Sequence, residues 1–431
     1  MKWLSLTVYL LAQLTAITGV TVINPRDGRV ETGRTVLVQG KQIAAVQPSS
    51  AKFPPGSRRI DGAGKFLIPG LWDSHVHLSK AGVLSLSLFI ANGITSVRDM
   101  GSNFEEVAKW RSQVESGTVI GPHIKTSGQM LESRANIERM KREGTIEPVD
   151  RLRIGVANPR EGRAAVDRLA ALGVDHIKMR TTPDLATFLA VGEEAALHHL
   201  PFAAHPVDTP AQLIQARLKS VEHFLTYPAL RLPQDQLFRR IKASGLLFSN
   251  TMANIPGLEL TPAAAAARLN EDPLRKYVCG YLANDWREQL AELKDYPKSF
   301  PAEMSAEYRN FRAMRQAGIP FLAGTDVAVV FMYPGFSLHK ELQLLVTEIG
   351  FTPMEALRIA SYNPHLFYAD TQNNGSIESG QPADLVLLDA DPISDIRNTK
   401  QIRGVMFAGR WFDRQALDQV LTQAAQSCNV Q

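Results

Sequence analysis

Between residues 65 and 371 the chain alternates short apolar runs of strand length with longer segments of helical periodicity. The eight expected strands are residues 70–77, 95–99, 123–127, 175–180, 202–205, 220–224, 246–250 and 320–326. The expected helices, several of which end at a helix-stopping glycine, include residues 104–115, 160–172, 185–198, 211–218, 236–244 and 306–317. Eight strands that alternate with helices fit a (β/α)8 TIM-like barrel, of class α/β, better than an open sheet.

Two longer segments, residues 131–159 and 256–301, interrupt this alternation. In a barrel the loops that follow the strands lie at the catalytic face, so both segments are candidates for lids or specificity walls. Surface helices without a role in function are the alternative for both.

Both ends of the chain have short strands separated by Gly and Asp turns. These strands are expected at residues 19–24, 35–39, 43–46, 375–380, 383–389 and 405–412. The simplest interpretation is one small β-sandwich domain built from residues 17–64 and 372–418, with the barrel of residues 65–371 inserted between them. The amino-terminal strands alone have too little core to form a stable domain.

The amino terminus has Lys2 followed by a short apolar run, which is typical of an export signal. We therefore expect residues 1–16 to form a signal peptide and the protein to be periplasmic or secreted. A buried first strand that starts early, in a cytoplasmic protein, is the alternative. No other stretch reaches the ~18 apolar residues that a bilayer span needs, so no integral membrane segment is expected.

The composition is that of an ordinary folded protein, with 45% hydrophobic and 21% charged residues, which excludes disordered and fibrous classes. The net charge of +4 is modest and no run of five or six basic residues occurs, so nucleic acid is not an expected partner. The two cysteines, Cys279 and Cys428, are too few for a disulfide scaffold and are not spaced as a metal motif.

The first expected strand ends in His75-Val76-His77. In a strand, residues i and i+2 point to the same face, so the two imidazoles project together and make half of a metal site. Alone this is a weak signal, because a His-x-His pair also arises by chance or as a hydrogen-bonded surface pair.

Four later strands each carry one metal-competent side chain near the carboxyl end, where barrel active sites form: Lys178, His205, His223 and Asp326. A buried lysine is costly unless it is paired or chemically altered. A neutral Lys178 amine can take up carbon dioxide to form a carbamate whose oxygens bridge two cations. A salt bridge at the barrel rim is the alternative for Lys178.

Together these segments resemble the metal-dependent amidohydrolase superfamily, close to its imidazolonepropionase-like and prolidase-like branch. Besides the metal-competent residues, the resemblance rests on Pro69 to His77, Gly93 to Asp99, Glu222-His223, Gly324-Thr325-Asp326 and Gly380 to Val386. It implies two divalent metal ions, one held by His75, His77 and Asp326 and the other by His205 and His223, with carboxylated Lys178 as the bridge. Zinc is the default for such ligands, although manganese, cobalt or iron also suit them.

A water between two cations is a much stronger acid than bulk water, so hydroxide is available near neutral pH. Asp326 is the expected catalytic residue, which accepts the proton of this water and passes it to the leaving nitrogen. Tyr227, Tyr333 and His176 are candidate substrate contacts, and for each the alternative is a packing or supporting role. Prolidase-like relatives often carry a Gly-Gly-His segment after the third strand, and residues 128–133 lack it, which weakens a dipeptidase assignment.

The sequence thus predicts a metal-dependent hydrolase of amide-type C–N bonds in a small peptide, an N-acyl amino acid or a cyclic amide. Within enzymes the alternatives are an esterase, lactonase or phosphotriesterase on the same site, or a one-metal enzyme in which Lys178 stays uncarboxylated. A barrel-fold binding protein without catalysis is the alternative from another class. Oligomeric state is left open, a homo-oligomer included.

Overall fold

The computed structural model describes residues 14–144, 147–206, 210–223, 235–254, 260–292, 300–370 and 373–429. Most of the predicted signal peptide and the predicted contact Tyr227 lie outside these residues. Thr15 and Ala16, the last positions before the predicted cleavage, are buried in the first described strand.

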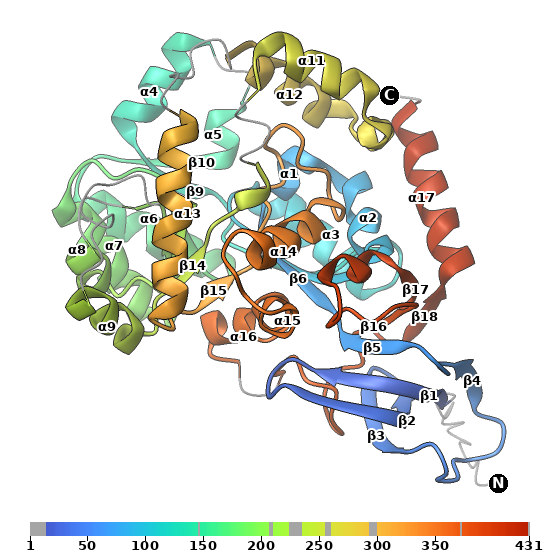
Figure 1. Ribbon diagram of the computed structural model, residues 1–431. Coiled ribbons are helices and arrows are strands. Elements are labelled where there is room, and N and C mark those ends of the chain that lie inside the picture. The colour runs from blue at the N-terminus through green and yellow to red at the C-terminus, as the bar shows by residue number, and fades with distance from the viewer. Residues whose placement is uncertain are drawn as a thin grey trace, which may run out of the picture.

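The strands form two parallel sheets and one mixed sheet (Figure 1). All eight predicted strands are confirmed as strands. The smaller parallel sheet, of three strands, contains β6 (Leu71–Val76), β7 (Ile94–Asp99) and β8 (His123–Thr126). The larger one has seven strands in the order β10 (Arg153–Val156), β9 (Met130–Ser133), β11 (Ile177–Met179), β12 (Phe202–Ala204), β13 (Ser220–Glu222), β14 (Leu247–Ser249) and β15 (Phe321–Leu322). These strands are almost wholly buried, as parallel strands covered by helices must be.

Backbone hydrogen bonds connect the two parallel sheets at both junctions. Ser74 N donates to Ala323 O at 2.8 Å, Asp326 N donates to His75 O at 2.7 Å, and Asp175 N donates to Thr126 O at 2.8 Å. A Cβ on Gly324 would lie 2.7 Å from the Cβ of His75, so only glycine permits this close approach. The α/β fold with parallel sheets is therefore confirmed, and the strands that carry the predicted ligands end on the same side.

Helices follow most of the strands in sequence. Those up to residue 206 are α1 (Leu78–Ala81), η1 (Val83–Ser85), α2 (Leu86–Ala91), α3 (Phe104–Glu115), α4 (Arg134–Glu143), α5 (Val149–Leu152), α6 (Pro159–Leu172) and α7 (Leu185–Leu197). Those that follow are α8 (Pro210–Gln215), α9 (Asp235–Ser244), η3 (Met252–Asn254), α11 (Pro262–Glu271), η4 (Pro273–Tyr277), α12 (Gly280–Glu292), α13 (Phe300–Gln316), α14 (Ser337–Thr347), α15 (Pro353–Ser361), α16 (Asn363–Tyr368) and η6 (Ile396–Lys400).

The six predicted helices are confirmed to within a few residues, because local signals define their ends. Asn158 and Asp184 accept hydrogen bonds from backbone N–H groups of the first turns of α6 and α7. Gly173 ends α6 in the left-handed conformation, with φ at 84°.

The interruption at residues 131–159 is not only a loop, since it contains β9 and β10. Leu131 of β9 pairs with Met179 of β11, so these two strands extend the parallel sheet. These strands were not recognised in the sequence because they carry charged residues, and Glu132 and Arg153 are buried in ion pairs with each other and with Glu147 and Arg180.

The second interruption, residues 256–301, supplies α11, η4 and α12. Helix α12 packs on the loop after β15, where Trp286 Nε1 donates to Ala328 O at 3.1 Å. The side-chain amide of Gln289 donates to the same carbonyl and accepts from Val330 N. This insertion therefore holds the chain segment that follows Asp326.

Strands from both chain ends form the mixed sheet, as predicted. It contains β1 (Thr15–Asn24), β2 (Arg29–Gln39), β3 (Gln42–Pro48), β4 (Arg58–Asp61), β5 (Phe66–Pro69), β16 (Leu385–Leu388), β17 (Ile402–Phe407) and β18 (Arg410–Asp413). Strand β5 joins the two ends, since it pairs in parallel with β1 and antiparallel with β16. The described strands of this region form one continuous sheet, so the two facing sheets of a β-sandwich are not confirmed. The domain boundaries stay a prediction.

The strand predicted at residues 375–380 is wrong. Asn373 and Asn374 accept hydrogen bonds from the backbone N–H groups of Gly375 and Ser376, which turns the chain. Ile377 then donates its N–H to the side chain of Asn24 instead of joining a strand ladder.

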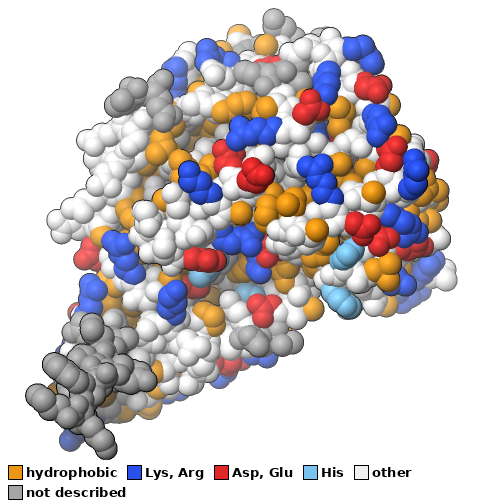
Figure 2. Space-filling model, turned by 180° about the vertical axis from the view of Figure 1, so that it is seen from behind, with side chains coloured by type: hydrophobic (Ala, Val, Ile, Leu, Met, Phe, Trp, Pro, Cys, Tyr) orange, Lys and Arg blue, Asp and Glu red, His pale blue; other side chains and the backbone are white. Residues whose placement is uncertain are grey.

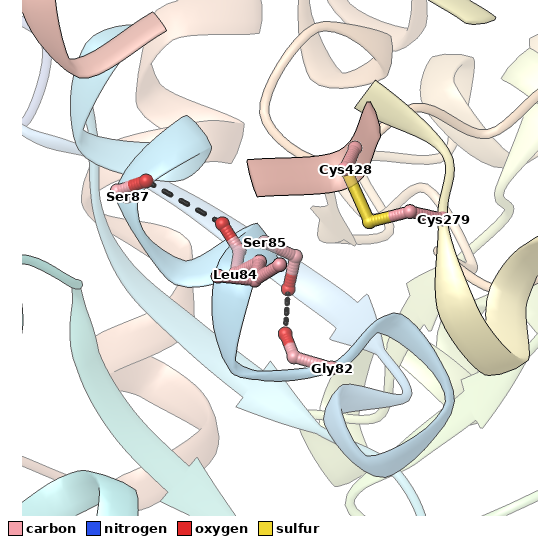
Figure 3. The surroundings of a disulfide bond; sticks show 6 residues. All are labelled: Gly82, Leu84, Ser85, Ser87, Cys279 and Cys428. Carbon is pink, nitrogen blue, oxygen red and sulfur yellow. Dashed lines mark hydrogen bonds between the residues drawn. A yellow bond between two sulfur atoms is a disulfide. The ribbon is translucent and has the colours of Figure 1, made fainter. Parts of the chain in front are cut away.

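Helix α17 (Arg414–Asn429) was not predicted, and it runs along the outside of the molecule beside α2 (Figure 1). Its last turn carries Cys428, which forms a disulfide with Cys279 between η4 and α12. The bond lies next to the segment Gly82 to Ser87 that follows β6 (Figure 3). The disulfide thus ties the carboxyl-terminal helix to the insertion, across a sequence separation of 149 residues.

Replacing Cys279 with Ser is expected to destabilise the protein by about 2–4 kcal/mol, because the unfolded chain loses a long covalent loop. Thermal unfolding with and without dithiothreitol measures this. The reductant should lower the midpoint of the parent and leave Cys279→Ser unchanged. Equal midpoints for the untreated parent and the variant would show that the crosslink does not contribute.

None of the helices in the described part of the chain combines the length and apolar character of a membrane span. On the face drawn in Figure 2, basic and acidic side chains are interspersed.

Candidate metal centre

Four predicted ligands converge at the carboxyl ends of β6, β13 and β15. His77 Nε2 lies 3.2 Å and His75 Nε2 3.6 Å from Asp326 Oδ1. His223 Nδ1 lies 3.7 Å from Asp326 Oδ2. One ligand atom from each of His75, His223 and Asp326 falls within 4.8 Å of the others, which is close enough for a shared cation.

The other two predicted ligands lie beside this group. The ring of His205, directly after β12, has its centroid 4.5 Å from that of His223. Lys178, in β11, is 1% exposed, and its charge acts on His75, His205 and His223. The structure therefore brings together His75, His77, His223 and Asp326, with the ring of His205 beside that of His223 and Lys178 buried in the neighbouring strand β11, which pairs with β12.

Backbone strain coincides with this group. His223 and Asp326 have φ angles of 67° and 61°, and Thr251, which contacts His223, has a φ of 48°. Non-glycine residues rarely occupy this left-handed region, and each such residue costs of the order of 1–3 kcal/mol. Strain of this kind persists where a site requires a particular side-chain direction.

Charge within the group is arranged around one ionised carboxylate. Burial raises the pKa of Asp326, but the imidazoles of His223 and His75 and a hydrogen bond with His77 outweigh it and hold the pKa well below its usual value. Burial lowers the pKa of Lys178 to about 7, so much of this amine is neutral near physiological pH. Burial also lowers the pKa of His205 and His223 well below the usual value, which favours the neutral imidazole that binds metals.

A buried ion pair orients His75. Its Nδ1 lies 2.8 Å from Glu222 Oε2, and Arg98 Nη2 donates to both oxygens of Glu222 at 2.9 Å. Arg98 also donates to Ser74 O at 2.6 Å and to Ser220 Oγ at 2.9 Å. Since Glu222 holds the proton on Nδ1, the other nitrogen of His75 is left free to bind a metal.

Two other ligands are oriented in a similar way. His77 Nδ1 lies 3.1 Å from the carbonyl oxygen of Gly101 and donates to it, which leaves Nε2 toward Asp326. His223 Nδ1 lies 3.0 Å from the hydroxyl of Thr251. These partners hold the imidazole rings in position.

The roles of Arg98, Glu222 and Thr251 were not predicted from the sequence, although Arg98 and Glu222 lie in the motifs quoted above. A signal was present, because both charged residues interrupt apolar strands that must be buried on both faces. Burial of each charge requires a partner of opposite sign. Two such residues, in β7 and β13, therefore indicate a pair inside the fold.

The predicted substrate contacts lie in different surroundings. His176 is fully buried, with Nε2 3.3 Å from Met100 Sδ and Nδ1 3.2 Å from the hydroxyl of Tyr368. Tyr333 is 4% exposed in the loop after Asp326, and its ring packs edge-on against Trp286. Contact of His176 or Tyr333 with a substrate stays a prediction.

Two buried atoms indicate that the group fits bound cations. His75 Nε2 and Lys178 Nζ are fully buried and have no hydrogen-bond partner among the described residues. Buried polar atoms are seldom left unpaired, so each such atom requires an explanation. A cation on His75, and a carbamate on Lys178 that ligates it, would satisfy both atoms.

A second group with suitable geometry lies on the surface. Asp167, Glu194 and His198 bring one ligand atom each within 4.8 Å, and His198 Nε2 is 2.7 Å from Asp167. Asp167 and His198 are exposed, and such acidic groups are common without a metal. This group is therefore a useful control for the buried one.

The chain is similar in sequence to known hydrolases. The amidohydrolase family model matches residues 66–412, which span both parallel sheets and part of the mixed sheet. Ochratoxinase of Aspergillus niger is 25% identical over 442 aligned positions, covering 88% of this chain and 82% of that protein. Imidazolonepropionase of Shouchella clausii is 26% identical over 391 positions, covering 84% and 80%.

Solved structures share the fold. A putative prolidase from Bifidobacterium longum superposes with a TM-score of 0.71 at 22% identity, covering 96% of this chain and 99% of that one. A Xaa-Pro dipeptidase with bound methionine in its active site gives a TM-score of 0.72 at 20% identity, covering 93% and 100%. The family model covers more than half of the chain, so the chain belongs to the amidohydrolase family and is an amide C–N bond hydrolase.

Proposed function

We propose that the protein is a two-metal hydrolase that cleaves the amide bond of a small peptide, an N-acyl amino acid or a cyclic amide. The observation that carries this proposal is the convergence of three histidines on the ionised carboxylate of Asp326 beside the unpaired amine of Lys178. The proteins that this chain resembles support it, since ochratoxinase, imidazolonepropionase and prolidase are all names of hydrolases.

His75, His77 and Asp326 would hold one cation, and His205 and His223 the other, with zinc as the default. Lys178 would bridge them as a carbamate. Its neutral amine would add to the carbon of carbon dioxide and lose a proton, which would turn an uncharged amine into an anionic carbamate able to ligate cations. The depressed pKa of Lys178, caused chiefly by burial, supplies the neutral amine.

Divalent cations held by these residues would lower the pKa of water and polarise a carbonyl oxygen, which would make hydrolysis feasible near neutral pH. Asp326 accepts the proton of the attacking water, because its carboxylate is ionised and faces His75, His77 and His223. It then donates this proton to the leaving nitrogen as the C–N bond breaks. Glu222 and Arg98 keep His75 in its required orientation throughout.

We also propose that the two parallel sheets form one (β/α)8 barrel. The hydrogen bonds of Ser74, Asp326 and Asp175 across the sheet junctions support this proposal. For the mixed sheet we propose a β-sandwich, supported by its own apolar cluster, in which strands from both chain ends meet.

Lys178→Ala tests the proposed site. Elemental analysis of protein purified with bicarbonate should give two metal ions per chain for the parent and one or none for the variant. Activity on dipeptides and N-acyl amino acids should fall with the metal. Added formate or acetate should restore part of both, because a small carboxylate can enter the space left by the lysine side chain.

Lys109→Ala, on an exposed face of α3, is the matched control and should leave metal content and activity unchanged. Zero or one metal in both the parent and Lys178→Ala would reject the bridging role. Hydrolysis of esters, lactones or phosphotriesters without any amide hydrolysis would replace the proposed substrate class, and full metal loading without any hydrolysis would favour a binding protein.

We propose an exported location, periplasmic or secreted, because disulfides such as Cys279–Cys428 persist mainly in oxidising compartments. Counting free thiols in protein taken directly from cells tests this, and two free thiols per chain would contradict it.

A further inference from the structure

Arg180 lies two residues beyond Lys178, directly after the carboxyl end of β11. It follows β11, and its N–H donates to Leu131 O at 2.9 Å, so the chain is still extended there. Side chains at i and i+2 share a face, which places His176, Lys178 and Arg180 in one column. His176 and Lys178 are buried, whereas 37% of the side chain of Arg180, the last of the three along the chain, is exposed.

Arg180 also ends a chain of alternating charges that joins both insertions to β11. In order, the chain consists of Asp285, Lys80, Glu147, Arg153, Glu132 and Arg180. Within it each of the three guanidinium nitrogens of Arg153 donates a hydrogen bond, two to the oxygens of Glu147 and one to Glu132. The inner members of the chain therefore have a structural role.

Arg180 differs from the inner members. Its single side-chain bond among the described residues is from Nη1 to Glu132 Oε2, at 3.3 Å. Glu132 also accepts from Arg153 and from the hydroxyl of Thr181, so its charge is already balanced without Arg180. The remaining donors of the Arg180 guanidinium are thus available at the mouth of the site.

The charge of Arg180 also faces the metal centre. It is among the positive charges that, together with the larger effect of burial, lower the pKa of Lys178 and of His205. Two residues of strand span about 7 Å. A carboxylate two or three bonds beyond the scissile nitrogen lies closer to the carbonyl than this, and the long side chain of Arg180 can span the difference.

We propose that Arg180 binds a carboxylate on the leaving side of the substrate, next to the scissile amide. This inference rests on the proposed amide hydrolysis, and it narrows the substrate class to N-acyl amino acids and short peptides whose last residue has a free carboxylate. Neutral cyclic amides lack the group that Arg180 recognises. The planar guanidinium suits a carboxylate, to which it can donate two parallel hydrogen bonds.

Matched substrate pairs test the inference on the metal-loaded full-length protein. The probes are N-acetyl-alanine, N-acetyl-leucine and N-acetyl-phenylalanine, each as the free acid and as the carboxamide, with acetate release as the readout. For the parent, kcat/KM should favour the acids by about 10- to 100-fold, as for a hydrogen bond to a charged group. Arg180→Gln should remove this preference by raising KM for the acids and should leave the carboxamides nearly unchanged.

Two further variants separate recognition from structure. Arg180→Lys keeps the positive charge but loses the two parallel N–H donors of the guanidinium, so it should retain part of the preference for the acids. Arg134→Gln, an exposed arginine of α4 paired with Glu161, should behave as the parent. Thermal unfolding of each variant reports on the fold.

The outcomes distinguish the inference from the function on which it depends. Amide hydrolysis with equal rates on acids and carboxamides, or an equal loss on both in Arg180→Gln, overturns the role of Arg180 and leaves the hydrolase intact. A metal-loaded parent that cleaves neither member of any pair, nor any dipeptide, overturns the proposed function and the inference together.

Discussion

Asp326→Asn is expected to lower kcat by about 100- to 10,000-fold, the usual contribution of a positioned proton acceptor and donor. The reason is that the carboxylate contacts His75, His77 and His223 and stays ionised, whereas an amide can neither take up the proton nor balance two cations. Single-turnover rates on a hydrolysed N-acyl amino acid measure the loss. Elemental analysis of the same sample separates lost chemistry from lost metal.

The control is Asp167→Asn, which alters the exposed group of Asp167, Glu194 and His198. This variant should keep the metal content and the rate of the parent, because that group is open to solvent. A fully metal-loaded Asp326→Asn protein with the parent rate would contradict the role given to Asp326.

Arg98→Met is expected to destabilise the fold by about 3–5 kcal/mol, the usual cost of removing one partner of a buried ion pair. The side chains of Arg98 and Glu222 are 1% and 0% exposed, so the remaining carboxylate would be buried without its guanidinium. Chemical denaturation monitored by fluorescence measures the change. Arg139→Met, which breaks an exposed pair with Glu143, should cost less than about 1 kcal/mol.

The double variant Arg98→Met/Glu222→Gln should recover part of that stability, because no unpaired charge remains. Its metal affinity should nevertheless fall by about 10- to 100-fold, since His75 loses the carboxylate that orients it. If stability and metal affinity change in parallel in Arg98→Met, Arg139→Met and the double variant, the pair does not have separate roles in fold stability and in orienting His75.

Much of the fold could be predicted from local patterns. Helix α3 was predicted to the residue because Asn103 caps it and its apolar positions recur at helical spacing. The eight strands could be predicted from short apolar runs, since a strand buried on both faces has few polar positions. Strands β9 and β10 were not predicted because they carry Glu132 and Arg153, whose charges are typical of exposed segments although the two residues are buried as a pair.

The site was predicted as far as residue types can indicate it. Histidine, lysine and aspartate side chains near strand ends suggest ligands, and the order of the strands suggests that they meet. Which nitrogen of His75 is free, however, depends on Glu222, 147 residues away along the chain. The disulfide between Cys279 and Cys428 is a contact of the same kind, across 149 residues.

The sequence by itself therefore determined most of the strands and helices and the identity of the candidate ligands, because these depend on neighbours within a few residues. Only the tertiary structure decided the orientation of the imidazoles, the pairing of Arg98 with Glu222 and the place of Arg180 at the mouth. Electrostatic and hydrogen-bond interactions act between atoms that are close in space, and the fold alone brings such distant residues together.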